Sequence, residues 1–371
     1  MSLKPHSLED RKSAIAAAMR AVGVQRLLLA SNGHHQIDRF NPVQHLTGFR
    51  AIGPALAVLN SEGRIYGFGL EHDAGHYPRS NIDGVTCLDD LQDIDFDPRN
   101  AGSVGFATLP RRLAGALRQR LGELPAFDQA FYAVSARKTD AEIDHVRRGT
   151  RIAELGMDRL LEIARPGRRE CDVAIEVNLY MKELGANDSF LMLNSGPRAD
   201  AVMPSSERPI ETGDLLLCEL SPCVEGQFTQ ICRTVSIGAP SQCVVEKYPL
   251  LVKAMLAGIA AAKPGATVGD VCARIDDDLS NEGYAQYSRP PFIRRRGHGF
   301  GGGSMAPGDV AVDNRTVLEP GMVFIVHPNQ FLPETGYMMC GETILITDNG
   351  HEILPQNTSR LLVAGAAGAR L

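Results

Sequence analysis

The feature that most constrains the fold of this chain is a pair of similar segments. Residues 164–185 (ARPGRRECDVAIEVNLYMKELG) resemble residues 262–284 (AKPGATVGDVCARIDDDLSNEGY). Each segment begins with a basic residue and Pro-Gly, continues through Asp-Val into a helical pattern, and ends near a glycine. Each also follows another helical pattern along the chain. A repeated pair of helices predicts one domain built from two related halves.

Strand patterns follow both helix pairs. Residues 214–220 (DLLLCEL) and 226–237 (GQFTQICRTVSI) are predicted to be strands of a hairpin. After the second helix pair, residues 321–327 (GMVFIVH) and 337–347 (YMMCGETILIT) have the same apolar, β-branched character. Two helices followed by β-structure in each half predict an α+β domain with its sheet in the middle.

The N-terminal part has a different pattern. Residues 8–22 have helical apolar spacing and precede an apolar strand at 25–30. Strand patterns at 51–59 and 63–69 flank a turn sequence, and residues 109–122 are helical again. This order predicts a separate α/β domain.

A long helix is predicted to begin the second domain. Thr139 is a candidate N-cap with Glu142 three residues later, the spacing of a capping box. The pattern continues to about residue 164, where Arg165-Pro166-Gly167 ends it. A chain of 371 residues is long enough for two or three domains. We therefore expect two, at 1–135 and 136–371.

Composition restricts the partners. With 38 basic and 44 acidic residues the formal charge is −6, which predicts no binding to nucleic acid or to anionic membranes. The chain has no run of apolar residues long enough to span a bilayer, and its first residues lack the apolar core of a signal peptide. The eight cysteines form no disulfide pattern. We expect a cytoplasmic enzyme with reduced thiols.

Several short motifs identify the chain as similar to the creatinase/aminopeptidase P/prolidase (M24) superfamily. They occur in family order, and the N-terminal domain adds a local match at His45-Leu46-Thr47-Gly48-Phe49. The resemblance implies a creatinase-type α/β N-terminal domain, a "pita-bread" α+β domain with an internal pseudo-two-fold repeat, and a homodimer. The motifs are Ser195-Gly196-Pro197, Gly213-Asp214, Lys263-Pro264-Gly265, Gly297-His298-Gly299-Phe300-Gly301, Glu319-Pro320-Gly321 and Glu342-Thr343-Ile344.

The resemblance also implies where a metal site should lie. The peptidases of this superfamily bind two divalent metal ions through two Asp, one His and two Glu. By the motif alignment these positions hold Glu219, Gln230, His298, His327 and Gly341. At two of these positions the carboxylate that would balance the charge of the metal ions is absent, because Gln230 is an amide and Gly341 has no side chain. The sequence therefore predicts a divergent member without the dinuclear site, closest in type to the metal-free creatinase- or ectoine hydrolase-like members.

The retained groups suggest proton-transfer chemistry. An imidazole titrates near neutral pH, so His298 is the predicted general acid/base. Glu219 lies in an apolar strand, where a carboxylate needs a purpose or a partner such as Arg233. Glu219 and His327 are predicted to position substrate and water. With His298, the same two side chains would also suit a single metal ion.

Other side chains are predicted to line the pocket. Gln230 shares a strand face with Cys232, so both are candidates for substrate binding. In family register position 341 points inward and Glu342 outward, but a slip of one residue would bring Cys340 and Glu342 in. The site prediction therefore includes Glu342 as a catalytic residue and Cys340 as a substrate contact. Arg296 and Phe300, on either side of His298, complete the predicted substrate contacts.

The prediction from sequence is thus a metal-independent hydrolase of a C–N bond in a small amide, amidine or guanidino acid. It needs no cofactor, and its partner is a small molecule. One alternative is a lyase or other small-molecule enzyme with one divalent metal ion at Glu219, His298 and His327. A second alternative is an inactive relative of Xaa-Pro peptidases that binds a peptide or protein.

Overall fold

The computed structural model describes residues 7–33, 36–37, 39–69, 85–87, 96–300, 305–357 and 359–365. The chain divides by its contacts into two compact units. The first comprises residues 1–142 with 300–306, and the second comprises residues 143–299 with 307–371. The predicted boundary at 135/136 lies before the long helix α5, whereas this division falls inside it.

The first unit is an α/β unit around one mixed sheet. Its described strands lie in the order β4-β3-β2-β1-β5, with β1 antiparallel to β2 and parallel to β5. The helices are α1 (Leu8–Ala21), α2 (Pro42–Thr47), α3 (Arg111–Leu121) and α4 (Asp128–Ser135), with a 3₁₀ turn at Phe106–Thr108. The strands are β1 (Arg26–Ser31), β2 (Ala55–Asn60), β3 (Ile65–Gly69), β4 (Val85–Cys87) and β5 (Ala101–Val104).

Alternation along β1 explains why helices cover both faces of this sheet. Leu27 and Leu29 pack with residues of α1, α2 and α4, whereas Leu28 and Ala30 pack with residues of α3. Successive side chains of a strand point to opposite faces, so a wholly apolar strand must be buried on both.

The second unit is an α+β unit with two main sheets. Its described strands form the orders β16-β9-β7-β6 and β10-β11-β14-β15. The helices are α5 (Asp140–Ile163), α6 (Glu170–Glu183), α7 (Gln242–Ala261) and α8 (Val268–Asn281), with a 3₁₀ turn at Ala285–Tyr287. The strands of the first sheet are β6 (Asp188–Gly196), β7 (Leu215–Val224), β8 (Gln227–Phe228), β9 (Ile231–Ile237) and β16 (Leu362–Ala364). The others are β10 (Gly297–Gly299), β11 (Val323–Val326), β12 (Gln330–Leu332), β13 (Gly336–Met338), β14 (Glu342–Thr347) and β15 (Gly350–Ile353).

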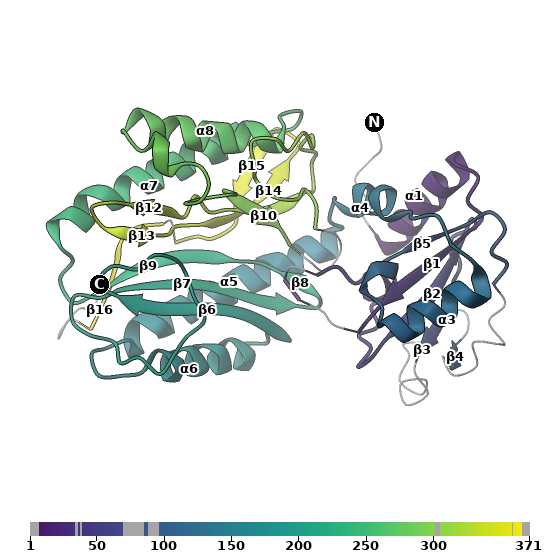
Figure 1. Ribbon diagram of the computed structural model, residues 1–371, viewed down its shortest axis with the longest axis horizontal. Coiled ribbons are helices and arrows are strands. Elements are labelled where there is room, and N and C mark those ends of the chain that lie inside the picture. Colours follow the sequence, from purple (N-terminus) through teal and green to yellow (C-terminus); the bar gives the residue numbers. More distant parts are fainter. Residues whose placement is uncertain are drawn as a thin grey trace. The chain divides into compact units, whose positions relative to one another are not determined.

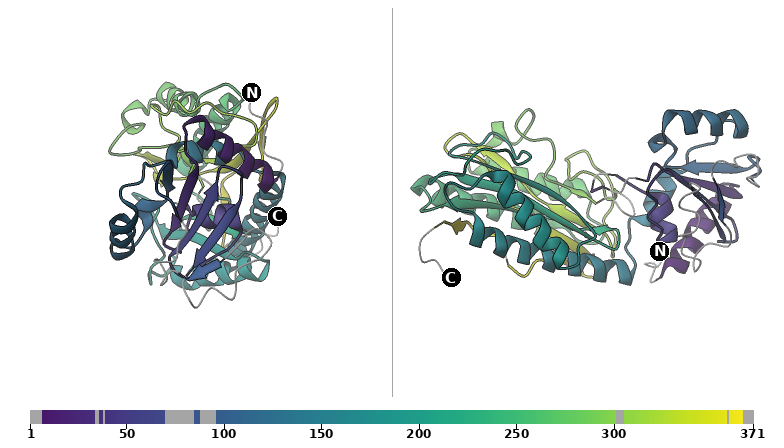
Figure 2. Two further views of the ribbon diagram at one scale, coloured as in Figure 1. Left: turned by 90° about the vertical axis from the view of Figure 1, so that its right-hand side faces the viewer. Right: turned by 90° about the horizontal axis from the view of Figure 1, so that it is seen from below.

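Within the second unit the layers run from helices through two sheets to helices. Helices α5 and α6 lie along the sheet of β6, β7 and β9, and α7 and α8 lie on the side of β14 and β15 (Figure 1). The view from below shows the same packing of α5 and α6 against their sheet (Figure 2). A buried apolar cluster joins α5 and α6 to that sheet, which explains the apolar stripe of the long helix. No helix in the described part of the chain is long and apolar enough to cross a membrane.

The two halves of this unit repeat one another in detail. After the first helix of each pair, Gly167 and Gly265 adopt φ of 89° and 86°, a conformation that favours glycine. Gly167 N donates to Ile210 O at 2.9 Å, and Gly265 N donates to Leu318 O at 3.0 Å. The repeated Pro-Gly sequences therefore form equivalent turns, which confirms the prediction of two related halves.

Local details of the second unit also follow the sequence. The capping box at the start of α5 forms, with Thr139 N donating to Glu142 at 2.8 Å and Glu142 N to Thr139 Oγ1 at 3.3 Å. The strand predicted at 226–237 is interrupted between β8 and β9, however. There Thr343 Oγ1 accepts from Gln230 N and donates to Gln230 O, so a side chain replaces the strand ladder.

Candidate functional site

Strand β7 places Glu219 in a buried polar group. Glu219 lies opposite Cys232 of β9, and the residue is 8% exposed. It accepts hydrogen bonds from Gln230 Nε2 at 3.2 Å and Asn329 Nδ2 at 3.4 Å, and the Cys232 thiol lies 3.9 Å away. Burial raises the pKa of Glu219 above its ordinary value, although these three contacts oppose the shift.

Strands β10 and β11 bring two imidazoles together. They pair so that His298 lies opposite Ile325, and His327 follows the end of β11. The two ring centroids are 5.1 Å apart, at an interplanar angle of 71°. His298 Nδ1 lies 2.8 Å from Gly299 O. Because a carbonyl oxygen only accepts, Nδ1 carries the proton, and Nε2 is the nitrogen whose protonation can change.

His327 is the more deeply buried of the two histidines. It is 7% exposed, and neither ring nitrogen has a hydrogen-bond partner among the described residues. Burial lowers the pKa of His327 well below its usual value, and the neighbouring His298 adds to this shift. His327 is therefore a neutral imidazole at physiological pH, able to exchange a hydrogen bond with a ligand or water.

Position 341 lies between His327 and Cys232, the residue next to the Glu219 carboxylate. Gly341 and Cys232 exchange two backbone hydrogen bonds of 3.0 and 3.2 Å. A Cβ at position 341 would lie 2.7 Å from His327 Cβ and 3.0 Å from Cys232 Cβ. This glycine therefore points toward His327 and Cys232, as the family register predicted, and the Cys232 thiol in turn lies beside Glu219.

Glu342 and Cys340 do not join this group, so the one-residue slip that would bring them in is wrong. Glu342 accepts from Ser359 Oγ at 2.6 Å and from Arg233 Nη2 at 3.1 Å. Cys340 is buried. Because neighbouring residues of a strand point to opposite faces, its thiol lies on the face of Arg233, opposite to the face of Gly341. The backbone bridge at Gly341 fixes this alternation. Neither the catalytic role predicted for Glu342 nor the substrate contact predicted for Cys340 is supported by their contacts.

The structure brings together some of the predicted substrate contacts and not others. Gln230 and Cys232 lie beside the Glu219 carboxylate, so their substrate roles stay predictions for this site. Arg296 is 1% exposed and bonds to Pro328 O, Gln330 and Asp276, so its guanidinium is committed within the fold. Phe300 is buried and belongs by its contacts to the first unit.

The sequence analysis did not predict two residues that interact with Glu219, namely Asn329 and Tyr337. Asn329 follows the apolar run of β11 and bonds to Glu219, and a polar residue just beyond an apolar strand is the signal that marks it. Burial and the charge of Glu219 raise the pKa of Tyr337 in β13. The ion pair suggested between Glu219 and Arg233 does not form, since Arg233 pairs with Glu342 instead.

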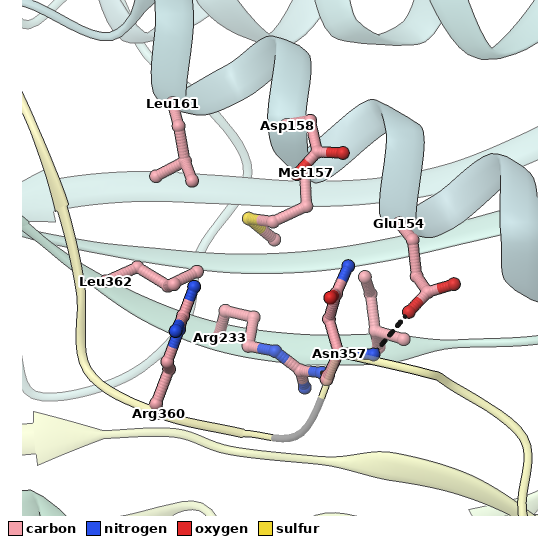
Figure 3. A pocket seen from close by; sticks show the side chains of 9 residues that line it. Glu154, Met157, Asp158, Leu161, Arg233, Asn357, Arg360 and Leu362 are labelled. Carbon is pink, nitrogen blue, oxygen red and sulfur yellow. Dashed lines mark hydrogen bonds between the residues drawn. The ribbon is translucent and has the colours of Figure 1, made fainter. Parts of the chain in front are cut away.

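A cavity of about 80 Å³ lies on the other side of β9 (Figure 3). Cys232 faces Glu219, whereas its neighbours Ile231 and Arg233 line this cavity, as strand alternation requires. The cavity is therefore separate from the group around Glu219.

Comparison with known proteins bears on what such a site does. The model of metallopeptidase family M24 matches residues 144–348. A Bacillus subtilis protein named "Uncharacterized peptidase YqhT" is 26% identical over 362 residues, which are 92% of this chain and 96% of that protein. The Xaa-Pro dipeptidase of Pyrococcus furiosus is 28% identical over 329 residues, 86% of this chain and 92% of that enzyme.

Solved structures establish the fold. The Xaa-Pro dipeptidase from Bacillus anthracis superimposes with a TM-score of 0.82 over 96% of this chain and all of that one, at 23% identity. The dipeptidase PepE from Mycobacterium ulcerans gives a TM-score of 0.80 over 96% of this chain and 97% of that one, at 24% identity. The prediction of a pita-bread domain preceded by an α/β domain is confirmed.

The same comparisons contradict the functional prediction. The relatives are named peptidases, dipeptidases and Xaa-Pro dipeptidases, so the prediction of a metal-independent, creatinase-like hydrolase of non-peptide C–N bonds is wrong. The prediction that excluded a typical Xaa-Pro peptidase is overturned by the same names. The prediction of no cofactor, with one divalent ion as the alternative, is contradicted by the match to a family of metallopeptidases. The prediction of no cofactor rested on five single ligand positions, whereas the match to the family model extends over most of the second unit.

Proposed function

The chain belongs to metallopeptidase family M24, and we propose that it is a peptidase that hydrolyses the peptide bond of short peptides, with dipeptides as the first class to test. The observation that carries the proposal is the pair of adjacent imidazoles, His298 and the buried His327, next to Gly341. The names of the relatives, which include Xaa-Pro dipeptidases and a peptidase, support peptides as the substrate class.

In this proposal His298 moves the proton. Its Nδ1–H is held by Gly299 O, so Nε2 accepts a proton from the attacking water as the water oxygen bonds to the peptide carbonyl carbon. When the C–N bond breaks, the same nitrogen returns the proton to the leaving amine. The residue thus acts first as general base and then as general acid.

Glu219 and His327 position the reactants. Gln230 and Asn329 hold the Glu219 carboxylate in place, and its remaining lone pairs accept from the attacking water. His327 is kept neutral by burial, so one ring nitrogen donates a hydrogen bond to the substrate carbonyl without adding a charge to the site.

The donor set of this site does not fit the two metal ions that the family implies. Among the described residues no group of three or more His, Cys, Asp or Glu side chains is placed to hold a metal ion. The Glu219 oxygens accept from two amides, Gln230 is itself an amide, and Gly341 supplies no ligand atom. We propose that the chain diverges from the family pattern at Gln230 and Gly341.

The test is a substrate panel. The purified chain is incubated with Xaa-Pro dipeptides, other dipeptides and non-peptide amides, each with and without added divalent ions, and the acid and amine products of hydrolysis are quantified. The proposal expects release from at least one dipeptide, above the rate for every non-peptide amide. Turnover of non-peptide amides alone, or of nothing in the panel, would overturn it.

We also propose that the chain forms a homodimer, and a measurement of its mass in solution tests this.

A further inference from the structure

The cavity beside helix α5 is lined by charges of both signs. Glu154 and Asp158 project into it from α5, and Arg360 projects from the segment that leads into β16 (Figure 3). Neither Asp158 nor Arg360 has an ion-pair partner among the described residues. Opposite charges that line one cavity without pairing favour a ligand that carries both.

A backbone hydrogen bond already holds one of the two carboxylates of the cavity, that of Glu154, in place. Glu154 is 3% exposed, and one of its oxygens accepts from Asn357 N at 2.7 Å, the contact drawn as a dashed line in Figure 3. Its other oxygen lies 3.7 Å from Arg151, beyond hydrogen-bond distance. Burial raises the pKa of Asp158, the charge of Arg151 lowers it, and the neighbouring carboxylate of Glu154 raises it. A cationic group placed between the two carboxylates would relieve that repulsion.

The remaining wall is apolar, and the cavity is small. It is formed by four side chains of α5, β9 and β16: Met157, Leu161, Ile231 and Leu362. At about 80 Å³ the cavity is about half the size of a protein cavity of about 150 Å³ that takes benzene. A ligand must therefore have few heavy atoms, with its two charges close together and a short apolar part.

A free α-amino acid combines these properties in the fewest atoms. We propose that the cavity is a binding site for a small α-amino acid, whose ammonium group contacts Glu154 and Asp158 and whose carboxylate contacts Arg360. The short side chain packs on the apolar wall. Binding here does not require the peptidase activity proposed for the other face of β9.

One guanidinium connects this cavity to the candidate site. Arg233 lines the cavity and donates to Asn357 O at 2.9 Å, next to the contact with Glu154. Its other amino group donates to Gly341 O at 2.8 Å, and Gly341 faces His327. The ligand would therefore lie against a residue that also fixes the backbone of the candidate site, without occupying that site.

Calorimetric titration of the full chain tests the proposal. The probes are alanine and valine, with isobutylamine and isobutyrate as analogues that carry only one of the two charges. An amino acid is expected to bind with a Kd of about 1 mM or lower, and each analogue at least about tenfold more weakly. Equal binding of the amine and the amino acid would mean that the site takes only a cation, and it would overturn the proposal.

Variants locate the binding. Asp158→Asn and Arg360→Ala change exposed side chains and are each expected to weaken amino-acid binding at least about tenfold. The controls Asp277→Asn and Arg148→Ala change exposed charges that do not line the cavity, and they should bind as the unaltered chain does. His298→Ala should also retain binding. Loss in His298→Ala with retention in Arg360→Ala would place the amino acid in the candidate site and refute the proposal.

Discussion

The buried ion pair of Arg233 and Glu342 holds the two sheets of the second unit together. Arg233 is 3% exposed and Glu342 is 1% exposed. Besides the carboxylate, the guanidinium donates to Cys232 O at 3.0 Å, Gly341 O at 2.8 Å and Asn357 O at 2.9 Å. Replacing Arg233 by Met keeps much of the side-chain volume but removes one hydrogen-bond donor from each of three carbonyls and leaves the buried Glu342 carboxylate without its cation.

The expected cost follows from these contacts. Removing one partner of a buried ion pair costs about 3–5 kcal/mol, because an uncompensated charge stays behind. Domains are stable by only about 5–15 kcal/mol, so Arg233→Met should remove about a fifth or more of the free energy of unfolding. The double variant Arg233→Met/Glu342→Leu removes both charges and should be more stable than Arg233→Met alone.

Denaturant titration followed by circular dichroism measures these differences. The exposed Arg148→Ala variant is the control and should change the free energy of unfolding by less than about 0.5 kcal/mol. A loss below about 1 kcal/mol in Arg233→Met would refute the reasoning. So would a double variant less stable than the single one, since the charge left unpaired would then not be the cause.

Three further predictions concern single residues. Gly341→Ala should cost about 1–3 kcal/mol of unfolding free energy because its Cβ would meet His327 at 2.7 Å, while Gly350→Ala, with no atom within 4 Å, should cost little; equal costs would be inconsistent with this packing. The pKa of His327 is lowered by folding, so the unfolded chain binds more protons as the pH falls below about 6.5 and stability is lost there. His327→Gln should flatten that loss in denaturant titrations, and an unchanged slope would argue against it. Burial raises the pKa of the Cys232 thiol, so iodoacetamide should label the less buried Cys243 before Cys232 in native protein, as mass spectrometry can check; simultaneous labelling of the two would speak against burial.

The sequence predicted those parts of the fold that depend on local chemistry. The Pro-Gly turns at Gly167 and Gly265 need a positive φ, and the capping box at Thr139 needs only a residue three positions later. Such signals are complete within a few residues, so the helix pairs and their repeat could be predicted from them. The strand break at Gln230 could not, because it depends on Thr343, far away in the sequence.

The candidate site could be predicted only in part for the same reason. Motif order placed Glu219, His298 and His327 near one another; in the structure the two histidines are adjacent, and Glu219 is linked to them through Cys232 and Gly341. Which of Gly341 and Glu342 faces the centre depends on a backbone bridge to Cys232 and on Ser359, and alternation alone leaves both registers open. The function predicted from single ligand positions was wrong, since the family match over residues 144–348 points to peptidases.

The most direct test of the proposed peptidase site compares two histidine variants on the best dipeptide of the panel. His298 and His351 each contact a backbone carbonyl oxygen through Nδ1, at 2.8 and 2.9 Å, but only His298 lies beside His327. We expect His298→Ala to lower kcat/KM by about 10²–10⁴-fold and His351→Ala to leave it within about twofold. Equal rates for His298→Ala and the unaltered chain would contradict the assignment of peptide hydrolysis to this site.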